Sequence, residues 1–399
     1  MESWKLEKEK PKSAILWVGF LIVDVFLHKT TQLEILKNLA RLGHKVDLFA
    51  LYSKEKTLSY HKDIKLSLVP LRYAPALTAF FFAIVVMMYL PLYVVKKRPR
   101  YIIVEPDLTV LVFLWKPLLN CLQAKLILDI RSTPVEVINF RKYLSALWFN
   151  VSVIAGKKAF DGMTILTLRM KKELCEDFQI QPEHIGVWTS GVSTEIYMAE
   201  KYDRDELRKK LSWTDKLVVM YHGRLDPHRG IFESIQAVKI AKDQNIRVLL
   251  FILGSGPIIA SCKKLAREIG VEEDVVFHTP VPYEKVPEFI AASDVGLVAL
   301  PNLAMWRNQS PLKLLEYLAM KKVTIVTDIP MIRDVIGESK CGVYIPSTDP
   351  QEIGKVMVYL YENREKLSEW GKFGRKIVEE RFDWRKVAED FESYLLQLN

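Results

Sequence analysis

The sequence predicts an α/β protein with two doubly wound parallel-sheet domains. Short apolar segments alternate with segments of helical spacing along most of the 399 residues, which is the pattern of a parallel sheet with helices on both faces. This alternation stops at a polar interval near residues 188–202 and then starts again. The length itself suits two or three domains of about 150 residues each.

The composition is that of a globular chain. Half of the residues are hydrophobic and 26% are charged, which excludes a disordered chain, a collagen and a disulfide-stapled miniprotein. The four cysteines lie far apart, without a Cys/His cluster. We therefore expect no cysteine-based zinc site, and the cysteine content fits a reducing compartment.

The first predicted domain starts with a buried strand at residues 14–19. Basic residues precede this apolar run as in a signal peptide, but Asp24 interrupts the run and no small-residue cleavage site follows before His28. A helix is predicted over residues 31–42 and ends at Gly43. Further short apolar runs predict strands at 46–51, 101–105, 125–129 and 162–166.

The uncharged segment 73–95 allows three interpretations: a membrane-spanning helix, a helix that lies on a membrane, or a buried core helix. A basic cluster at residues 96–100 follows it, which suits an anionic lipid surface. The strand at 101–105 must pair with the strand at 14–19, and one span between them would put a single sheet on two sides of a membrane. We therefore disfavour the spanning helix and prefer membrane contact over complete burial.

The second predicted domain repeats the same alternation. A charged helix-forming stretch at residues 202–212 comes first. Strands are then predicted at 217–221, 247–253, 275–278, 295–300, 324–327 and 342–345, with helical segments between them. We place the first domain at residues 1–193 and the second at 194–382. The amphipathic C-terminal helix, in segment 383–399, needs a surface to dock on, and the first domain is the candidate.

The segment 221–230 follows a predicted strand and precedes a helix. Gly223 lets the backbone come close to a ligand, and Gly230 opens the helix. Arg224 and Arg229 place two cations at the carboxyl end of a strand, where open α/β sheets bind ligands. Two guanidinium groups there suit a diphosphate. The alternative is a turn with solvated arginines.

A glycine-rich turn, Gly254-Ser255-Gly256-Pro257, follows the next strand. Such a turn into a helix can hold an anion. It lacks the third glycine of a dinucleotide-binding fingerprint, and turns of this kind also simply connect elements.

The third motif, residues 308–319, predicts a helix with Ser310 as its N-cap and Pro311 at its first position. Its free amides can meet phosphate or sugar oxygens. Lys313 and Glu316 share one helix face, and Glu316 can accept two hydrogen bonds from a ribose diol. The alternative is a surface ion pair on an amphipathic helix.

These motifs, in this order, resemble the retaining family-four glycosyltransferases of the GT-B fold, in which two Rossmann-like domains face a central cleft. The resemblance rests on GRL…RG, GSGP and SPLKLLEYLAMKKV, on the intervening VVFHTPVPYEKVPEFIAASDVGLVAL, and on the hinge WTSGVSTEIYM with Gly191. It covers residues 160–345 well and the first domain loosely.

The resemblance implies a donor site for a nucleotide-diphosphate sugar. Arg224 and Arg229 would hold the pyrophosphate, with Arg229 at a position where the family usually has lysine. Glu316 matches the second glutamate of the family's E-x7-E pattern and would bind the ribose, whereas Asn308 replaces the first glutamate. Only Gly19 stands where the family has a double glycine after the first strand. The donor-binding residues would be Gly223, Gly254, Gly256, Asn308, Gln309, Ser310, Pro311, Leu312, Lys313 and Glu316, and the base-lining residues His278, Thr279 and Pro280.

The resemblance also implies catalysis without a metal ion or other cofactor. The two arginines and the helix amides would take over the charge of the departing diphosphate. Retention would follow from same-face attack within one ternary complex. Glu105 and Asp129 end strands and face the cleft by topology; with Arg224 and Arg229 they form the predicted catalytic set, although each carboxylate is also explained by a structural role. The Asp-x-Asp at residues 203–205 is interpreted as a solvated charge cluster and not as a metal site.

The sequence therefore predicts a glycosyltransferase that moves a sugar from a UDP- or GDP-linked donor to a lipid-linked or glycan acceptor. We expect a cytoplasmic protein, peripheral on the inner membrane face through residues 73–100, without a nucleic-acid partner. A GT-B-fold nucleotide-sugar 2-epimerase is the alternative enzyme, which would need no acceptor. A degenerate binding module is the non-enzymatic alternative, and the joint presence of Arg224, Arg229 and Glu316 argues against it.

Overall fold

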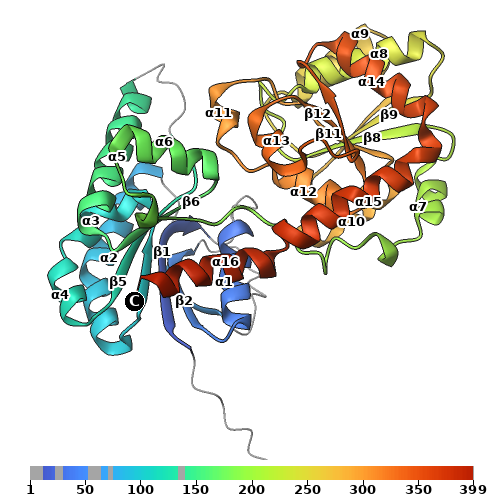
Figure 1. Cartoon of the computed structure of the whole chain (residues 1–399). Coiled ribbons are helices and arrows are strands. Elements are labelled where there is room, and N and C mark those ends of the chain that lie inside the picture. Colours follow the sequence, from blue (N-terminus) through green and yellow to red (C-terminus); the bar gives the residue numbers. More distant parts are fainter. Residues whose placement is uncertain (1–11, 23–29, 53–63, 71–74, 134–139, 399) are drawn as a thin grey trace, which may run out of the picture. The chain divides into compact units, whose positions relative to one another are not determined.

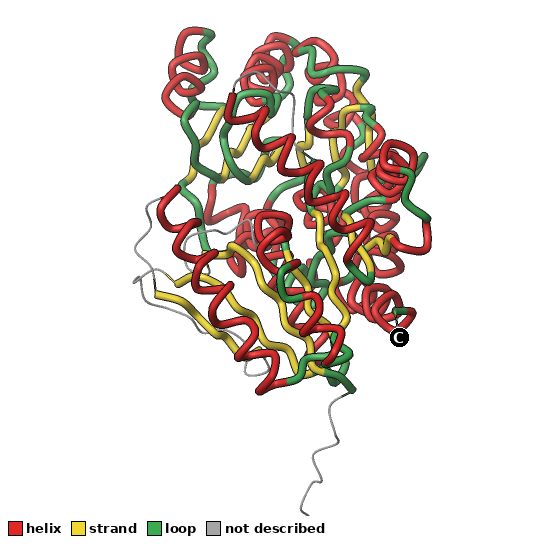
Figure 2. The backbone as a smooth tube through the Cα atoms, turned by 90° about the vertical axis from the view of Figure 1, so that its left-hand side faces the viewer, coloured by secondary structure: helices red, strands yellow, loops and turns green. Residues whose placement is uncertain are grey.

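The computed structural model describes residues 12–22, 30–52, 64–70, 75–133 and 140–398. The chain divides into two compact units (Figure 1). The first unit consists of Met1–Thr189 together with Val387–Asn399, and the second is Ser190–Lys386. In each unit the strands form one layer between helices (Figure 2).

The first unit contains a seven-stranded parallel sheet in the order β3-β2-β1-β4-β5-β6-β7. The strand β4 pairs in parallel with β1, as the pairing argument from the sequence required. Every predicted strand of this domain is present, and β3 and β7 are additional edge strands. The strands are β1 (Ala14–Ile22), β2 (Lys45–Tyr52), β3 (Ile64–Pro70), β4 (Tyr101–Val104), β5 (Lys125–Ile130), β6 (Gly162–Ile165) and β7 (Ile185–Val187).

The strands β1, β2 and β3 follow one another toward one edge of the sheet, and β4 to β7 follow one another toward the other edge. Because each connection has the same hand, this reversal places helices on both faces of the sheet. The helix α1 (Thr30–Arg41), predicted at residues 31–42, lies on one face. The helices on the other face share a single apolar core with the sheet. They are α2 (Pro75–Lys97), α3 (Thr109–Phe113), α4 (Lys116–Cys121), α5 (Phe140–Ala159) and α6 (Leu168–Phe178).

The uncharged segment forms one helix, α2, which continues through Pro91. One side of it, including Phe82, Val86 and Val94, is buried in the core. The opposite side is exposed, and Met88 and Leu92 are each 70% exposed. Among the described residues, no helix is both long and apolar enough to cross a membrane. The helix is therefore half core and half surface.

The last helix, α16 (Trp384–Gln397), brings the end of the chain to the first unit. Phe391 packs against Trp188 with 5.3 Å between ring centroids, and the Tyr394 hydroxyl donates to the carbonyl of His184 at 2.7 Å. A Cβ atom on Gly186 would lie 2.4 Å from the Tyr394 ring, so this glycine makes room for the helix. The end of the chain therefore closes the face of the sheet on which α1 lies.

The second unit contains a six-stranded parallel sheet in the order β10-β9-β8-β11-β12-β13. All six strands predicted for this domain are present. They are β8 (Leu217–His222), β9 (Val248–Leu253), β10 (Val275–His278), β11 (Val295–Val298), β12 (Val323–Thr327) and β13 (Gly342–Ile345). The strand order reverses between β8 and β11, and the ligand sites of such sheets lie outside the carboxyl ends of the strands at this point.

Two apolar cores lie on the two faces of this sheet. One core includes α8 (Ile231–Asp243), α9 (Ile259–Glu268) and α14 (Pro350–Glu362). The other includes α10 (Val286–Ala292), α12 (Leu312–Ala319) and α13 (Pro330–Ile336). The remaining helices are α7 (Arg204–Leu211), α11 (Ala304–Arg307) and α15 (Leu367–Ile377).

Candidate functional site

Glu316 belongs to α12 and lies near the carboxyl end of β8. Its Oε2 atom is 3.1 Å from Nε2 of His222, the last residue of β8. Its Oε1 atom accepts a hydrogen bond from the Tyr197 hydroxyl at 3.0 Å. The residue is only 8% exposed. This burial contradicts the alternative of a surface ion pair on an amphipathic helix.

The burial of this cluster sets its protonation. Burial raises the pKa of Glu316 to about 7. Burial, helped by the charge of Lys313, lowers the pKa of His222 to about 3. His222 is therefore a neutral imidazole at neutral pH, and Glu316 is close to its titration midpoint. A ligand that prefers the carboxylate would bind together with proton release.

Lys313 points back over the end of β8. Its Nζ atom lies 3.7 Å from the ring centroid of Tyr221 and is buried without a hydrogen-bond partner among the described residues. A Cβ atom added to Gly223 would lie 3.5 Å from this nitrogen. Burial, and then the charge of Arg229, lower the pKa of Lys313 well below its ordinary value. The charge of Glu316 opposes this shift without cancelling it, and an anion at this point would supply the remaining counter-charge.

Arg224 and Arg229 differ in how they are held. The Arg229 guanidinium lies 4.9 Å from the ring centroid of Trp306, and its buried Nε makes no hydrogen bond within the described part of the chain. Arg224 donates from Nε to Asp226 at 2.7 Å, and its side chain is 69% exposed. Arg229 is therefore the preorganised cation of the loop, whereas Arg224 lies on the surface, paired with Asp226.

The two predicted glycine turns pack on each other. A Cβ atom on Gly254 would lie 1.9 Å from the carbonyl oxygen of Gly223, and one on Gly256 would lie 2.0 Å from that of Leu225. The N–H of Leu225 donates to the carbonyl of Ser255 at 2.8 Å. The glycines thus allow the loop after β9 to support the loop that carries the two arginines.

We expect Gly254→Ala to destabilise the second unit and to weaken ligand binding at this site, because the added methyl group forces the two loops apart. Overpacking of this kind costs about 1–3 kcal/mol, which lowers the melting midpoint by a few degrees. Calorimetric melting measures the effect, and Ser255→Ala at the exposed neighbouring position is the control. Equal melting midpoints for the two variants would contradict this interpretation.

The start of α12 differs from the prediction. The helix begins at Leu312, and its N-cap residue is Pro311, with φ −82° and ψ 83° and no side-chain cap. The prediction of Ser310 as N-cap and Pro311 as first helical residue is therefore wrong. The N–H of Leu312 donates to the carbonyl of Ser310 at 3.0 Å, so this amide is already used. Asn308 is buried beside this turn, and the N–H of Gln309 donates to Trp306 at 3.3 Å.

The predicted base-lining residues follow the edge strand β10. The carbonyl of His278 accepts a hydrogen bond from the N–H of Gly254 at 3.0 Å, which joins this segment to the glycine turn. The His278 ring packs against Phe289 with 5.0 Å between centroids. Thr279 and Pro280 are exposed. Their backbone therefore lies at the same edge of the sheet as the arginine loop, and their contact with a base stays a prediction.

The two predicted carboxylates of the first unit are both buried in it. Asp129 accepts hydrogen bonds from Thr164 at 2.7 Å and from the Trp188 indole at 2.8 Å. Burial raises its pKa. Glu105 approaches Gly19 so closely that a Cβ atom there would lie 2.6 Å from the carboxylate. Asp129 has a structural role in holding Trp188, and catalytic roles for both residues remain predictions.

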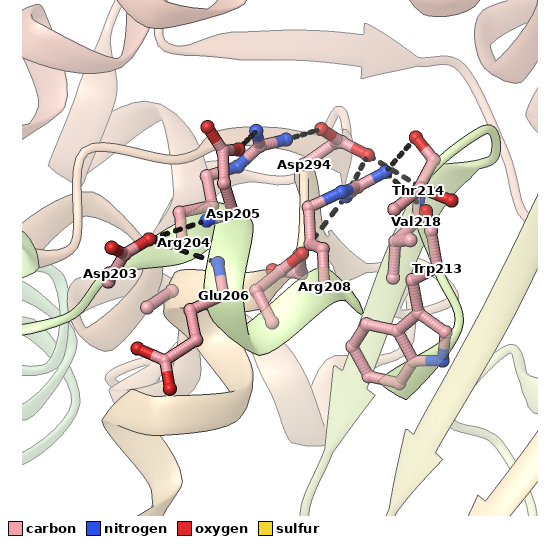
Figure 3. A network of polar contacts seen from close by, with 12 residues as sticks. Asp203, Arg204, Asp205, Glu206, Arg208, Trp213, Thr214, Val218 and Asp294 are labelled. Carbon is pink, nitrogen blue, oxygen red and sulfur yellow. Dashed lines mark hydrogen bonds and ion pairs between the residues drawn. The ribbon is translucent and has the colours of Figure 1, made fainter. Parts of the chain in front are cut away.

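The Asp-x-Asp sequence begins α7 (Figure 3). Asp203 caps the helix by accepting from the N–H groups of Asp205 and Glu206, while Arg204 pairs with Asp294. Arg208, one turn later, is buried and donates to Asp294 at 3.0 Å. In the described residues, no group of three or more His, Cys, Asp or Glu side chains is placed to hold a metal ion. This motif fastens α7 to the sheet.

Sequence reasoning did not assign roles to Tyr197, Trp306 and His222. Tyr197 lies 119 positions from the carboxylate that it contacts, and no local pattern reports such a pairing. The role of Trp306 could have been suspected from the sequence, because an aromatic residue next to the donor motif can form a cation–π contact with an arginine. His222 was visible only as a polar residue at a strand end.

Comparison with known proteins bears on the same region. Residues 203–377 match the family described as Glycosyl transferases group 1. An uncharacterised glycosyltransferase of Methanocaldococcus jannaschii is 23% identical over 61% of this chain and 59% of its own length. A GDP-mannose-dependent alpha-(1-6)-phosphatidylinositol monomannoside mannosyltransferase of Mycolicibacterium smegmatis is 24% identical over 49% of this chain and 52% of its own length. The chain thus spans little more than half the length of these relatives.

Solved structures match nearly the whole chain. The Anabaena protein HepE, crystallised with UDP, is 13% identical with a TM-score of 0.73 over 96% of this chain and 100% of its own. A glycosyltransferase of Rickettsia africae is 15% identical with a TM-score of 0.73 over 97% of this chain and 98% of its own. The chain therefore has the GT-B fold that its sequence predicted, and the part of it that resembles glycosyl transferases group 1 lies in its second unit.

Proposed function

We propose that the protein is a retaining glycosyltransferase that moves a sugar from a UDP- or GDP-linked donor to a lipid-linked or glycan acceptor, without a metal ion. The observation that carries this proposal is the cluster at the end of β8. There the buried carboxylate of Glu316 interacts with the charge of Lys313, which in turn interacts with Arg229, and Lys313 Nζ and Arg229 Nε have no hydrogen-bond partner among the described residues. A nucleoside diphosphate carries a partner for each group. Its ribose diol can donate hydrogen bonds to the carboxylate, and its dianionic diphosphate can accept them from the two nitrogen atoms.

Each group has one task in this proposal. The Glu316 carboxylate accepts hydrogen bonds from the two ribose hydroxyls, while the Tyr197 hydroxyl holds it in place. Arg229 and Lys313 meet the diphosphate, and the exposed Arg224 contacts it from the surface. These cations stabilise the negative charge that develops as the sugar leaves. Asn308 faces the donor sugar, and the backbone of residues 278–280 lines the base.

The proposed acceptor and location follow from α2. Its exposed side is apolar, and the exposed residues Lys96 and Lys97 lie at its end. Such a surface suits peripheral contact with the anionic inner, cytosolic membrane face through residues 73–100. Relatives named as phosphatidylinositol monomannoside mannosyltransferases support a lipid-linked acceptor.

The test is turnover of UDP- and GDP-linked sugars by the purified chain, first with EDTA present, and with or without candidate glycolipid acceptors. We expect acceptor-dependent release of UDP or GDP, and NMR of the product should show the donor's anomeric configuration. Conversion of the donor to an isomeric nucleotide sugar without acceptor would support the epimerase instead. An inverted product, or turnover lost on chelation, would overturn that part of the proposal.

The pKa of Glu316 predicts how binding depends on pH. The carboxylate is the form that accepts from both ribose hydroxyls, and with a pKa of about 7 it is mostly protonated at pH 6 and mostly ionised at pH 8. We expect the ratio of nucleotide affinities, wild type over Glu316→Gln, to rise about tenfold across this range. Calorimetric titration measures both proteins. Because the charge of Glu316 also raises the pKa of Lys313, the ratio is measured again in Lys313→Met, where that titration is absent. A flat ratio would contradict the assignment of ribose binding.

A further inference from the structure

An apolar face covers three helices of the first unit and not α2 alone. We define it as the exposed apolar side chains of α2, α3 and α5 with the residue after α3. They are Phe81, Ile84, Met87, Met88, Tyr89, Leu92, Val95, Phe113, Leu114, Tyr143, Leu144, Leu147, Trp148, Val151 and Ile154. Most exposed large apolar side chains of the described chain are therefore on these helices. Single exposed apolar residues are ordinary, but a contiguous set marks an interaction site.

The three helices form one layer on the same face of the sheet (Figure 1). Phe82 of α2, Val112 of α3 and Val153 of α5 are buried in one core beneath them. The helix α3 contacts both α2 and α5. Trp148 and Ser152 of α5 donate to the carbonyl of Pro106, each at 3.1 Å, which holds α5 against the segment before α3. The exposed sides thus belong to one rigid layer.

The charged residues of these helices are all basic, whereas Asp107, just before α3, is exposed and acidic. The helices α2, α3, α4 and α5 contain no aspartate or glutamate. Their ends carry exposed lysines, Lys96 and Lys97 on α2 and Lys157 and Lys158 on α5. A second copy of the chain would bring like charges together at such a face. An anionic bilayer instead offers phosphate groups to the lysines, at about 1 kcal/mol each, and a medium for the apolar side chains.

We propose that α3 and α5 join α2 in one bilayer-binding face, so that the first unit docks on an anionic membrane through all three helices. This extends the peripheral contact of the proposed function and does not depend on the transfer reaction. Tyr89, Tyr143 and Trp148 are the amphipathic aromatic residues expected at the level of the headgroups. Apolar insertion supplies affinity, and the lysines select the anionic surface.

The test is flotation of the full chain with phosphatidylglycerol–phosphatidylcholine vesicles and with pure phosphatidylcholine vesicles. The variant combines Leu144→Gln, Leu147→Gln and Val151→Gln, which keep the net charge. We expect binding to the anionic vesicles to fall about tenfold or more, because each buried leucine side chain is worth about 1.5–3 kcal/mol. The matched control combines Tyr359→Gln, Phe373→Gln and Leu396→Gln, exposed apolar residues elsewhere in the fold, and should bind like wild type.

Three results would overturn the inference. The first is unchanged vesicle binding by the α5 variant, and the second is an equal loss of vesicle binding in the control variant. The third is a wild-type dimer in sedimentation that is lost in the α5 variant and kept in the control. The last would assign the face to a second copy. Calorimetric melting, expected to be unchanged in the α5 variant, reports that the first unit, which contains α5, is folded. Vesicle binding by a chain that turns over no donor would refute the proposed function and leave this inference standing.

Discussion

Replacing Arg229 with alanine is expected to lower kcat/KM for the donor about 100- to 1,000-fold, the size of effect seen when one preorganised donor to a developing anion is removed. The guanidinium lies 4.9 Å from the ring centroid of Trp306, and its Nε lies 3.8 Å from Asp226, so its position is already set before a ligand binds. Preorganised charge of this kind acts mainly in the transition state, because it needs no rearrangement as the diphosphate departs.

Steady-state kinetics with Arg229→Ala, Arg229→Lys and Arg364→Ala test this prediction. The lysine variant keeps the positive charge and should retain most of the activity. Arg364 is the matched control, because it also lies over an aromatic ring, that of Tyr361 at 5.0 Å from the ring centroid. Arg364 is close enough to Arg208 to lower the pKa of that residue. Arg208 is bound through Asp294 to the N-terminal ends of β8 and β11, so Arg364 lies away from the carboxyl ends of the strands where the site is. Wild-type kcat/KM in Arg229→Ala would refute the assignment of the diphosphate site.

Replacing Glu316 with alanine should weaken nucleotide binding and turnover by about 1–3 kcal/mol, the contribution of a hydrogen bond to a charged group. This corresponds to about a 5- to 150-fold loss. The same change removes the partner of the Tyr197 hydroxyl and the neighbour of His222. Part of the effect on the alanine variant will therefore be a loss of stability.

Two further variants separate binding from stability. Glu316→Gln keeps the shape and the contact with Tyr197 but loses the charge, so it should melt close to wild type and still bind nucleotide less tightly. Tyr197→Phe removes one hydrogen bond and should change affinity less than either variant. Glu369→Ala, at an exposed position of α15, is the control for removing a glutamate. Unaltered kinetics in both Glu316 variants would remove the main site assignment.

Most elements of the fold were predictable because their signals are local. Each strand of the second unit is a short apolar run between turn residues, and all of them were predicted. The strands β3 and β7 were missed for different reasons. In β3, Lys65 and Ser67 interrupt the apolar run, as suits an edge strand, and β7 has only three residues. Neither gives the continuous apolar signal of a central parallel strand.

The candidate site was predictable only in part. The order of motifs located Arg229, Lys313 and Glu316, but helical spacing placed the last two equally well on a solvated surface. At the start of α12 the local rule failed: Ser310 and Pro311 have the residue types of an N-cap and a first helical position, yet the turn after α11 uses Pro311 as the cap. Local preference is weak there compared with the packing of the buried turn around Asn308.

Taken alone, the amino-acid sequence determined the alternation of strands and helices, the position of the glycine turns and the apolar character of α2, because periodicity and turn chemistry act over a few neighbouring residues. Only the tertiary structure decided which charges are buried, which partner each one has, and that α5 exposes an apolar side in the same layer as α2. The reason is that burial depends on residues far apart in the chain, as in the contact between Tyr197 and Glu316.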